Sequence, residues 1–115
     1  MIKLFNEYNS NSEYYWRIEP DEYPSSDKII DISPEALDFV KKHYSKSKFI
    51  TVKTHKLYND QTRFTTKRFI EISTYDRCIM TIIELPDEWF YISKIDNLFY
   101  KCDQLEGLKK FILSE

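Results

Sequence analysis

The fold is decided by residues 78–101, CIMTIIELPDEWFYISKIDNLFYK, where short turn signals separate three apolar runs. These runs are rich in the β-branched and aromatic residues typical of strands. Pro86-Asp87 suits a type I turn, and Asp96-Asn97 suits a second turn. Because the connections are short, we expect antiparallel neighbours. The three expected strands are Cys78–Leu85, Trp89–Ile92 and Leu98–Lys101.

Two further strands are expected upstream of this stretch. From Phe49 to Tyr58, apolar residues alternate with polar ones, which is the period-two pattern of a half-buried strand. In the next segment, Arg63–Tyr75, isoleucines alternate with charged residues such as Lys67 and Glu71. Asn59-Asp60-Gln61 between them indicates a turn. The pattern therefore predicts a meander of about five strands.

A helix is expected on each side of the meander. Ser33 is a candidate N-cap, Pro34 suits the first helical position, and the helix should end near Lys46. The second helix should follow Asp103, which has the capping-box spacing to Glu106. The buried stripe of the first helix is Leu37, Val40 and Tyr44, and that of the second is Leu105, Leu108, Phe111 and Ile112.

Gly107 is the single glycine of the chain, and it falls inside the second helix. A glycine there costs about 1 kcal/mol relative to alanine. We therefore expect close packing of this helix against the sheet.

Residues 1–28 are expected to form an N-terminal arm, with one strand over Glu13–Ile18 followed by a loop rich in Pro and Ser. Residues 29–115 are expected to form a single α+β domain. The expected architecture is a two-layer sandwich of helix, antiparallel meander and helix, with both helices on one face of the sheet.

Length and composition exclude several classes of protein. A chain of 115 residues suffices for one domain with a real core. No apolar run has the length of a signal peptide or a membrane span, so we expect a soluble intracellular protein of a host cytoplasm, virion or organelle. The abundance of Ile, Lys, Phe, Tyr and Asn over Gly, Ala, Arg and Pro is the bias of an AT-rich genome. Two cysteines do not indicate a disulfide scaffold.

Charge is distributed unevenly along the chain. Residues 41–68 contain nine basic residues and one acid, a local net of +8. Residues 1–40 have three basic and nine acidic residues, and residues 69–115 have five and nine. Such an asymmetry can determine which partners a protein attracts.

The basic segment supplies the candidate binding residues, in which cationic side chains are interleaved with aromatics. They are Lys53, Lys56, Tyr58, Arg63, Phe64, Lys67 and Arg68. This set could dock an acidic protein surface or a neighbouring subunit, or bind phosphates and stack bases. The scarcity of arginine weakens the nucleic-acid interpretation. The lysines could also be an ordinary solvated face that protects a sheet edge, or could be covered by the acidic arm.

The sequence does not favour an enzyme, a metal site or a cofactor. A zinc site would need His43, His55, Cys78 and Cys102, whose spacing matches no short zinc motif. A cysteine nucleophile needs a histidine in contact, and Cys102 lies before a helix N-terminus that could lower its pKa. With a single glycine, the chain has no glycine-rich phosphate loop.

The C-terminal part of the chain contains Pro86-Asp87-Glu88-Trp89-Phe90-Tyr91-Ile92, followed by Tyr100-Lys101-Cys102-Asp103-Gln104-Leu105-Glu106-Gly107-Leu108. This pattern resembles small uncharacterised proteins of large DNA viruses. The resemblance implies a viral protein, and it implies no activity.

The leading expectation is a non-enzymatic interaction or structural protein, a subunit of a larger viral or organellar assembly that docks an acidic partner through residues 41–68. The alternative is a small nucleic-acid-binding module that uses the same basic face.

Overall fold

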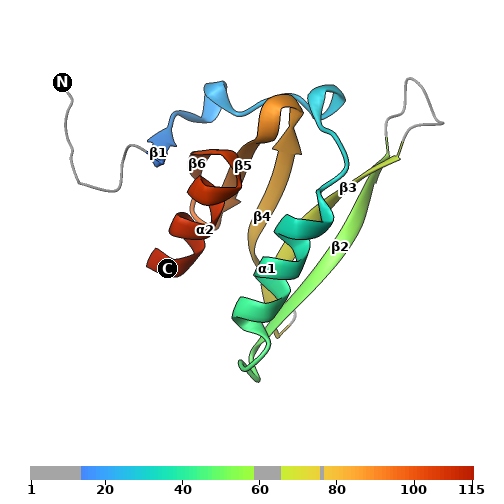
Figure 1. Ribbon diagram of the computed structural model, residues 1–115, viewed down its shortest axis with the longest axis vertical. Coiled ribbons are helices and arrows are strands. Elements are labelled where there is room, and N and C mark those ends of the chain that lie inside the picture. The colour runs from blue at the N-terminus through green and yellow to red at the C-terminus, as the bar shows by residue number, and fades with distance from the viewer. Residues whose placement is uncertain (1–13, 59–65, 76) are drawn as a thin grey trace.

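The computed structural model of this chain describes residues 14–58, 66–75 and 77–115. These residues form an α+β fold with a six-stranded antiparallel sheet and two α-helices, so the predicted fold class is confirmed at this level (Figure 1). The strands are β1 Tyr15–Ile18, β2 Ile50–Tyr58, β3 Thr66–Thr74, β4 Arg77–Leu85, β5 Trp89–Lys94 and β6 Leu98–Asp103. The helices are α1 Pro34–Tyr44 and α2 Gln104–Ser114, and the short 3₁₀ turns are η3 Pro20–Glu22, η4 Ser26–Lys28 and η5 Pro86–Glu88.

The strand order across the sheet is β1-β6-β5-β4-β3-β2, and every neighbouring pair is antiparallel. Strands β2 to β6 form the meander expected from the sequence. The sixth strand comes from the expected N-terminal arm, where β1 pairs with β6 so that Tyr15 lies opposite Cys102. The two edges of the sheet are therefore β1 and β2.

Both helices contribute to one hydrophobic core against the sheet (Figure 1). Ala36 and Val40 of α1 and Leu108 and Phe111 of α2 are buried with the inward side chains of the strands, such as Ile82. We call the opposite side of the sheet the outer face.

The start of α1 is anchored to the sheet by a buried carboxylate. The Ser33 hydroxyl accepts a hydrogen bond from the Ala36 amide at 3.4 Å, which confirms the predicted N-cap. The Ser33 amide in turn donates to Glu84 Oε1 at 2.8 Å, and Glu84 is only 5% exposed. A carboxylate at this position also interacts favourably with the positive end of the helix dipole.

The second helix, α2, begins directly after Asp103, as predicted, but the predicted capping contact is absent. The Asp103 side chain makes no capping hydrogen bond, so the capping box with Glu106 is wrong. Instead, the Asp103 amide donates to the Tyr14 carbonyl at 2.8 Å. A Cβ added at Gly107 would lie 2.3 Å from that same carbonyl oxygen, so glycine permits the close approach of α2 to the residue before β1.

The predicted type I turn after β4 is also wrong. Asp87 has a φ of 66°, whereas both central residues of a type I turn have negative φ. At the next turn, Asp96 and Asn97 have φ values of 72° and 60°, in the left-handed region, within the three-residue connection between the paired Lys94 and Leu98.

The outer face is partly covered by the segment between β1 and α1, residues 19–29. Tyr23 packs on Phe99 and Tyr91, with ring centroids 5.1 Å and 6.2 Å away. Ile29 is buried with Ile83 in a second hydrophobic cluster. Burial raises the pKa of the Tyr23 hydroxyl, and a hydrogen bond with Thr81 partly offsets this effect. None of the described helices combines the length and the apolar character needed to cross a lipid bilayer.

Candidate functional site

The predicted binding residues lie on both sides of the β2–β3 pair. Lys53 lies opposite Glu71 and Lys67 lies opposite Leu57, all on the outer face. Lys56 pairs with Arg68, and both lie on the side of the sheet that carries the helices. Lys53, Lys56 and Arg68 are exposed and Lys67 is half-buried. The other predicted binding residues, Arg63, Phe64 and the side chain of Tyr58, lie outside the described residues.

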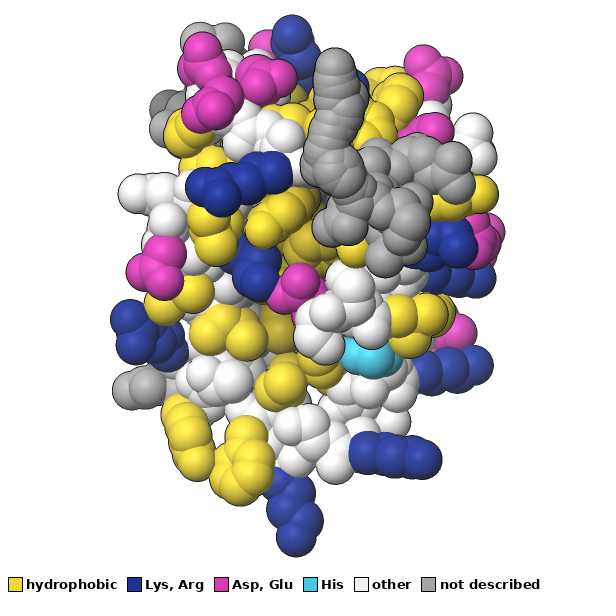
Figure 2. Space-filling model, turned by 90° about the vertical axis from the view of Figure 1, so that its left-hand side faces the viewer, with side chains coloured by type: hydrophobic (Ala, Val, Ile, Leu, Met, Phe, Trp, Pro, Cys, Tyr) yellow, Lys and Arg dark blue, Asp and Glu magenta, His cyan; other side chains and the backbone are white. Residues whose placement is uncertain are grey.

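The acidic residues after β1 lie away from these lysines. Glu19, Asp21 and Glu22 are exposed around η3, and we call these three residues the acidic turn. Figure 2, which looks at the molecule from the left-hand side of Figure 1, shows a group of acidic side chains at the upper left of that face, with other acidic and basic side chains interspersed below it. Among the described residues, no ion pair joins an acid of residues 14–28 to a basic residue of β2 or β3.

An exposed aromatic pair lies where β2 begins. Phe49 is 58% exposed and Tyr75 is 79% exposed, and their ring centroids are 5.7 Å apart. The exposed side chains of Lys46 and Lys48 precede this pair in the chain, and Arg77 follows it. We call Lys46, Lys48, Lys53 and Lys56 the basic edge.

Sequence reasoning missed this aromatic pair, because Phe49 and Tyr75 are 26 positions apart in the chain. The strand register contains the signal. Ile50 lies opposite Thr74, so the residue before Ile50 and the residue after Thr74 come together.

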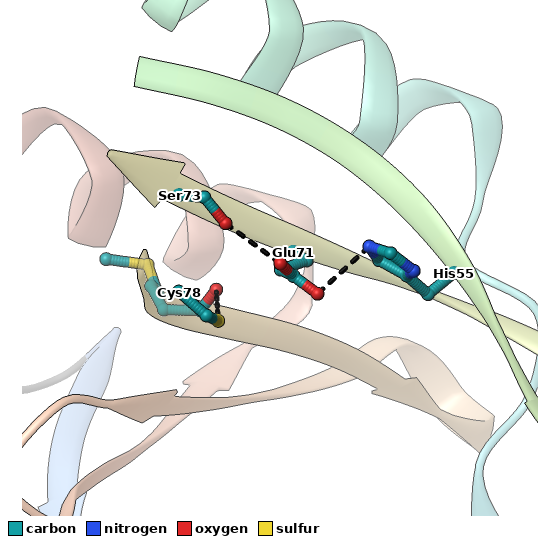
Figure 3. A network of polar contacts seen from close by, with 5 residues as sticks. His55, Glu71, Ser73 and Cys78 are labelled. Atoms are coloured by element: carbon teal, nitrogen blue, oxygen red, sulfur yellow. Dashed lines mark hydrogen bonds and ion pairs between the residues drawn. The ribbon is translucent and has the colours of Figure 1, made fainter. Parts of the chain in front are cut away.

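A polar network lies on the outer face beside Lys53 (Figure 3). Nε2 of His55 is 2.9 Å from Oε1 of Glu71, and the Ser73 hydroxyl donates to Oε2 of Glu71 at 2.8 Å. Nε2 is buried without a well-directed hydrogen bond among the described residues, so its approach to Glu71 is a close polar contact. Because Glu71 lies between the other two side chains, His55 is not positioned to take a proton from Ser73, as a triad requires.

The two cysteines are poor nucleophiles in this fold. Burial raises the pKa of the Cys102 thiol far above its ordinary value, so the expectation that the helix start would lower it is wrong. The pKa of Cys78 is also raised, first by partial burial and then by the negative charge of Glu71. The Cys78 thiol donates to the Met80 carbonyl at 3.7 Å, which offsets part of this rise.

Metal ligands are not brought together in the part of the chain that the structure describes. No three side chains of His, Cys, Asp or Glu gather there in a way that could hold an ion. The four residues considered for zinc, His43, His55, Cys78 and Cys102, thus form no such group.

On the outer face near the β1 edge, the ammonium group of Lys101 is surrounded by aromatic rings. Nζ of Lys101 lies 4.2 Å from the ring centroid of Trp89, 5.6 Å from that of Tyr91 and 5.8 Å from that of Trp16. These are distances at which ammonium groups are attracted to aromatic faces. This cation is therefore held by its own chain and joins β1, β5 and β6.

No family model, curated protein or solved structure matches this chain.

Proposed function

We propose that this protein is a non-enzymatic interaction protein, a subunit of a larger viral or organellar assembly, which docks an acidic partner on its basic edge. The observation that carries the proposal is that this edge combines exposed lysines with an exposed aromatic pair. None of its four lysines forms an ion pair within residues 14–58, 66–75 and 77–115.

Charge and exposure explain why this edge suits a protein surface. The four lysines give this edge a local excess of positive charge, which an acidic partner compensates and which increases the rate of encounter with such a partner. Large aromatic side chains such as Phe49 and Tyr75 supply apolar contact area, and aromatic residues are enriched at protein interfaces. The place of β2 in the sheet supports the same proposal, because among the described strands β2 pairs with β3 alone and its other side has no partner strand.

A single-stranded nucleic acid is the second candidate ligand. Exposed rings beside lysines can stack bases while the ammonium groups contact phosphates. The pair Phe49 and Tyr75 beside Lys48 favours this alternative. The preponderance of Lys over Arg on the edge disfavours specific recognition of bases.

Fluorescence anisotropy with two labelled probes, a short polyglutamate peptide and an oligothymidylate, tests the proposal. We expect the peptide to bind at low ionic strength and to dissociate as salt is added. The double variant Lys53→Glu/Lys56→Glu should weaken peptide binding about tenfold, because each exposed pair contributes about 0.2–1 kcal/mol and reversal adds repulsion.

The matched control is Lys28→Glu/Lys109→Glu, which makes the same change in net charge away from the basic edge and should bind the peptide like the unmodified chain. Failure of the peptide to bind at low ionic strength would refute the proposal. Tighter binding of the oligothymidylate, lost on Phe49→Ala, would favour the second candidate.

A further inference from the structure

The charged groups differ between the two edges of the sheet, and β1 itself contains one exposed cation, Arg17, and no acid. The β2 edge carries the basic edge, and β1 is followed directly by the acidic turn, Glu19, Asp21 and Glu22. In Figure 1 these edge strands lie on opposite sides of the view, with β1 on the left and β2 on the right. Acidic side chains therefore follow one edge strand of the described sheet, and basic side chains lie in and before the other.

The strand directions in the sheet allow β1 of one copy to pair with β2 of another. The described sheet has six strands and every neighbouring pair is antiparallel, so β1 and β2 run in opposite directions within it. A second copy that continues the sheet with its helices on the same side would thus place its β1 antiparallel to β2 of the first copy.

Antiparallel pairing also brings the opposite charges together. The C-terminal end of one strand then lies beside the N-terminal end of the other. The acidic turn follows the C-terminal end of β1, and Lys46 and Lys48 precede the N-terminal end of β2. In the register that places Trp16 opposite Lys53, both on the outer face, Ile18 comes opposite Thr51, close to those two lysines.

We propose that the acidic partner is a second copy of this chain, whose β1 adds to the β2 edge in a head-to-tail array. This inference rests on the function proposed above and names its partner. Lysines on a sheet edge ordinarily prevent pairing with other edges. Here the lysines disfavour pairing of two β2 strands, because Lys53 and Lys56 of both copies would lie along the same interface and repel each other. They favour pairing with β1, because three acids follow that strand.

The interface is heterologous, because different surfaces of the two copies meet. Such contacts continue to an open chain or close into a ring, and do not stop at a symmetric dimer. The ladder is short, since β1 has four residues, so we expect association that is weak and depends strongly on protein concentration.

Sedimentation velocity of the full chain tests the proposal. At an ionic strength of about 0.01 M, where the Debye length is about 30 Å, the average mass should rise continuously with protein concentration. At about 0.1 M the Debye length falls to about 10 Å, and the association constant should fall at least about tenfold.

Two charge-reversed variants make the test specific. Lys48→Glu/Lys53→Glu cancels the net charge of the basic edge and keeps the acidic turn, and Glu19→Lys/Asp21→Lys/Glu22→Lys places basic residues at both edges. Each should be monomeric alone, and mixing the two should restore association, which also shows that both are folded. The control Lys28→Glu/Lys109→Glu should associate like the unmodified chain.

Three results would overturn this inference: a chain that stays monomeric at low salt, a dimer that does not grow with concentration, or reversed variants that do not associate when mixed. A monomeric chain that still binds polyglutamate would remove the self-association and leave the proposed function standing. A chain that neither associates with itself nor binds polyglutamate would overturn this inference and the proposed function together.

Discussion

Gly107→Ala is expected to destabilise the protein, although alanine is the better helix former. The substitution alone would favour α2 by about 1 kcal/mol. In the folded chain, however, the new Cβ would lie 2.3 Å from the Tyr14 carbonyl oxygen and 3.3 Å from its carbonyl carbon. The obstacle is backbone and cannot rotate away, so α2 and the start of β1 must separate by about 1 Å to restore ordinary van der Waals contact.

The cost of this separation exceeds the gain in helix propensity. Overpacking of this kind typically costs about 1–3 kcal/mol. The hydrogen bond from the Asp103 amide to the Tyr14 carbonyl, 2.8 Å long, would also be weakened, with a further loss of about 0.5–1.5 kcal/mol. The net effect is a decrease of about 1–3 kcal/mol in the free energy of unfolding, after the gain in helix propensity is subtracted.

Urea denaturation followed by tryptophan fluorescence measures this effect. Trp16 of β1 lies edge-on to Trp89 of β5 at a centroid distance of 6.1 Å, so a displaced β1 should also change the native spectrum. The control is Glu106→Ala, an exposed neighbour in α2 whose replacement should change the stability by less than about 0.5 kcal/mol. A Gly107→Ala protein as stable as the unmodified chain, or more stable, would refute the reasoning.

Three further predictions follow from buried or charged groups. Because burial raises the pKa of Cys102, its thiol stays neutral in the folded state at a pH at which the unfolded thiol ionises. The contribution of this thiol to the free energy of unfolding is therefore complete below the unfolded pKa of about 8.5 and is lost as the pH rises above it. Urea titrations above that pH should show a loss approaching about 1.4 kcal/mol per pH unit that is absent in Cys102→Ala; equal slopes would contradict this. Glu71→Gln should accelerate alkylation of Cys78 by iodoacetamide, measured by mass spectrometry at fixed pH, because it removes the negative charge that raises the pKa of this thiol; an unchanged rate would show that Glu71 does not act on it. Glu84→Ala should lower the free energy of unfolding by about 1–3 kcal/mol, because the partly buried Ser33 amide loses its acceptor. A change below about 0.5 kcal/mol in urea denaturation would mean that α1 does not depend on this contact.

Local signals in the sequence predicted most of the fold. The Ser33 cap identified α1, and the period-two segments together with the apolar runs between turn signals identified the five strands of the meander, because these features depend on neighbours within a few residues. Long-range contacts could not be predicted in this way. The capping box at Asp103 is absent because the Asp103 amide, which the Glu106 side chain would have to bind, donates to the carbonyl of Tyr14, far away in the sequence.

The candidate site was predicted in part, for a similar reason. Alternation along β2 and β3 correctly indicates that Lys53 and Lys67 share a face, and by the same rule it separates them from Lys56 and Arg68. The aromatic pair beside the lysines depends on the register between two strands, which no local pattern reveals.

The pairing of β1 with β6 has a consequence for the order of folding. β1 is synthesised before every other strand of the described sheet, and its partner β6 is the last strand to be synthesised. Contacts between distant segments form late, because a long loop must first be closed. Until then, the edge of β6 is open, and a β1 from another nascent chain could occupy it. Gly107 lies against Tyr14, the residue before β1, so it marks the contact that forms when β1 pairs with β6 of its own chain.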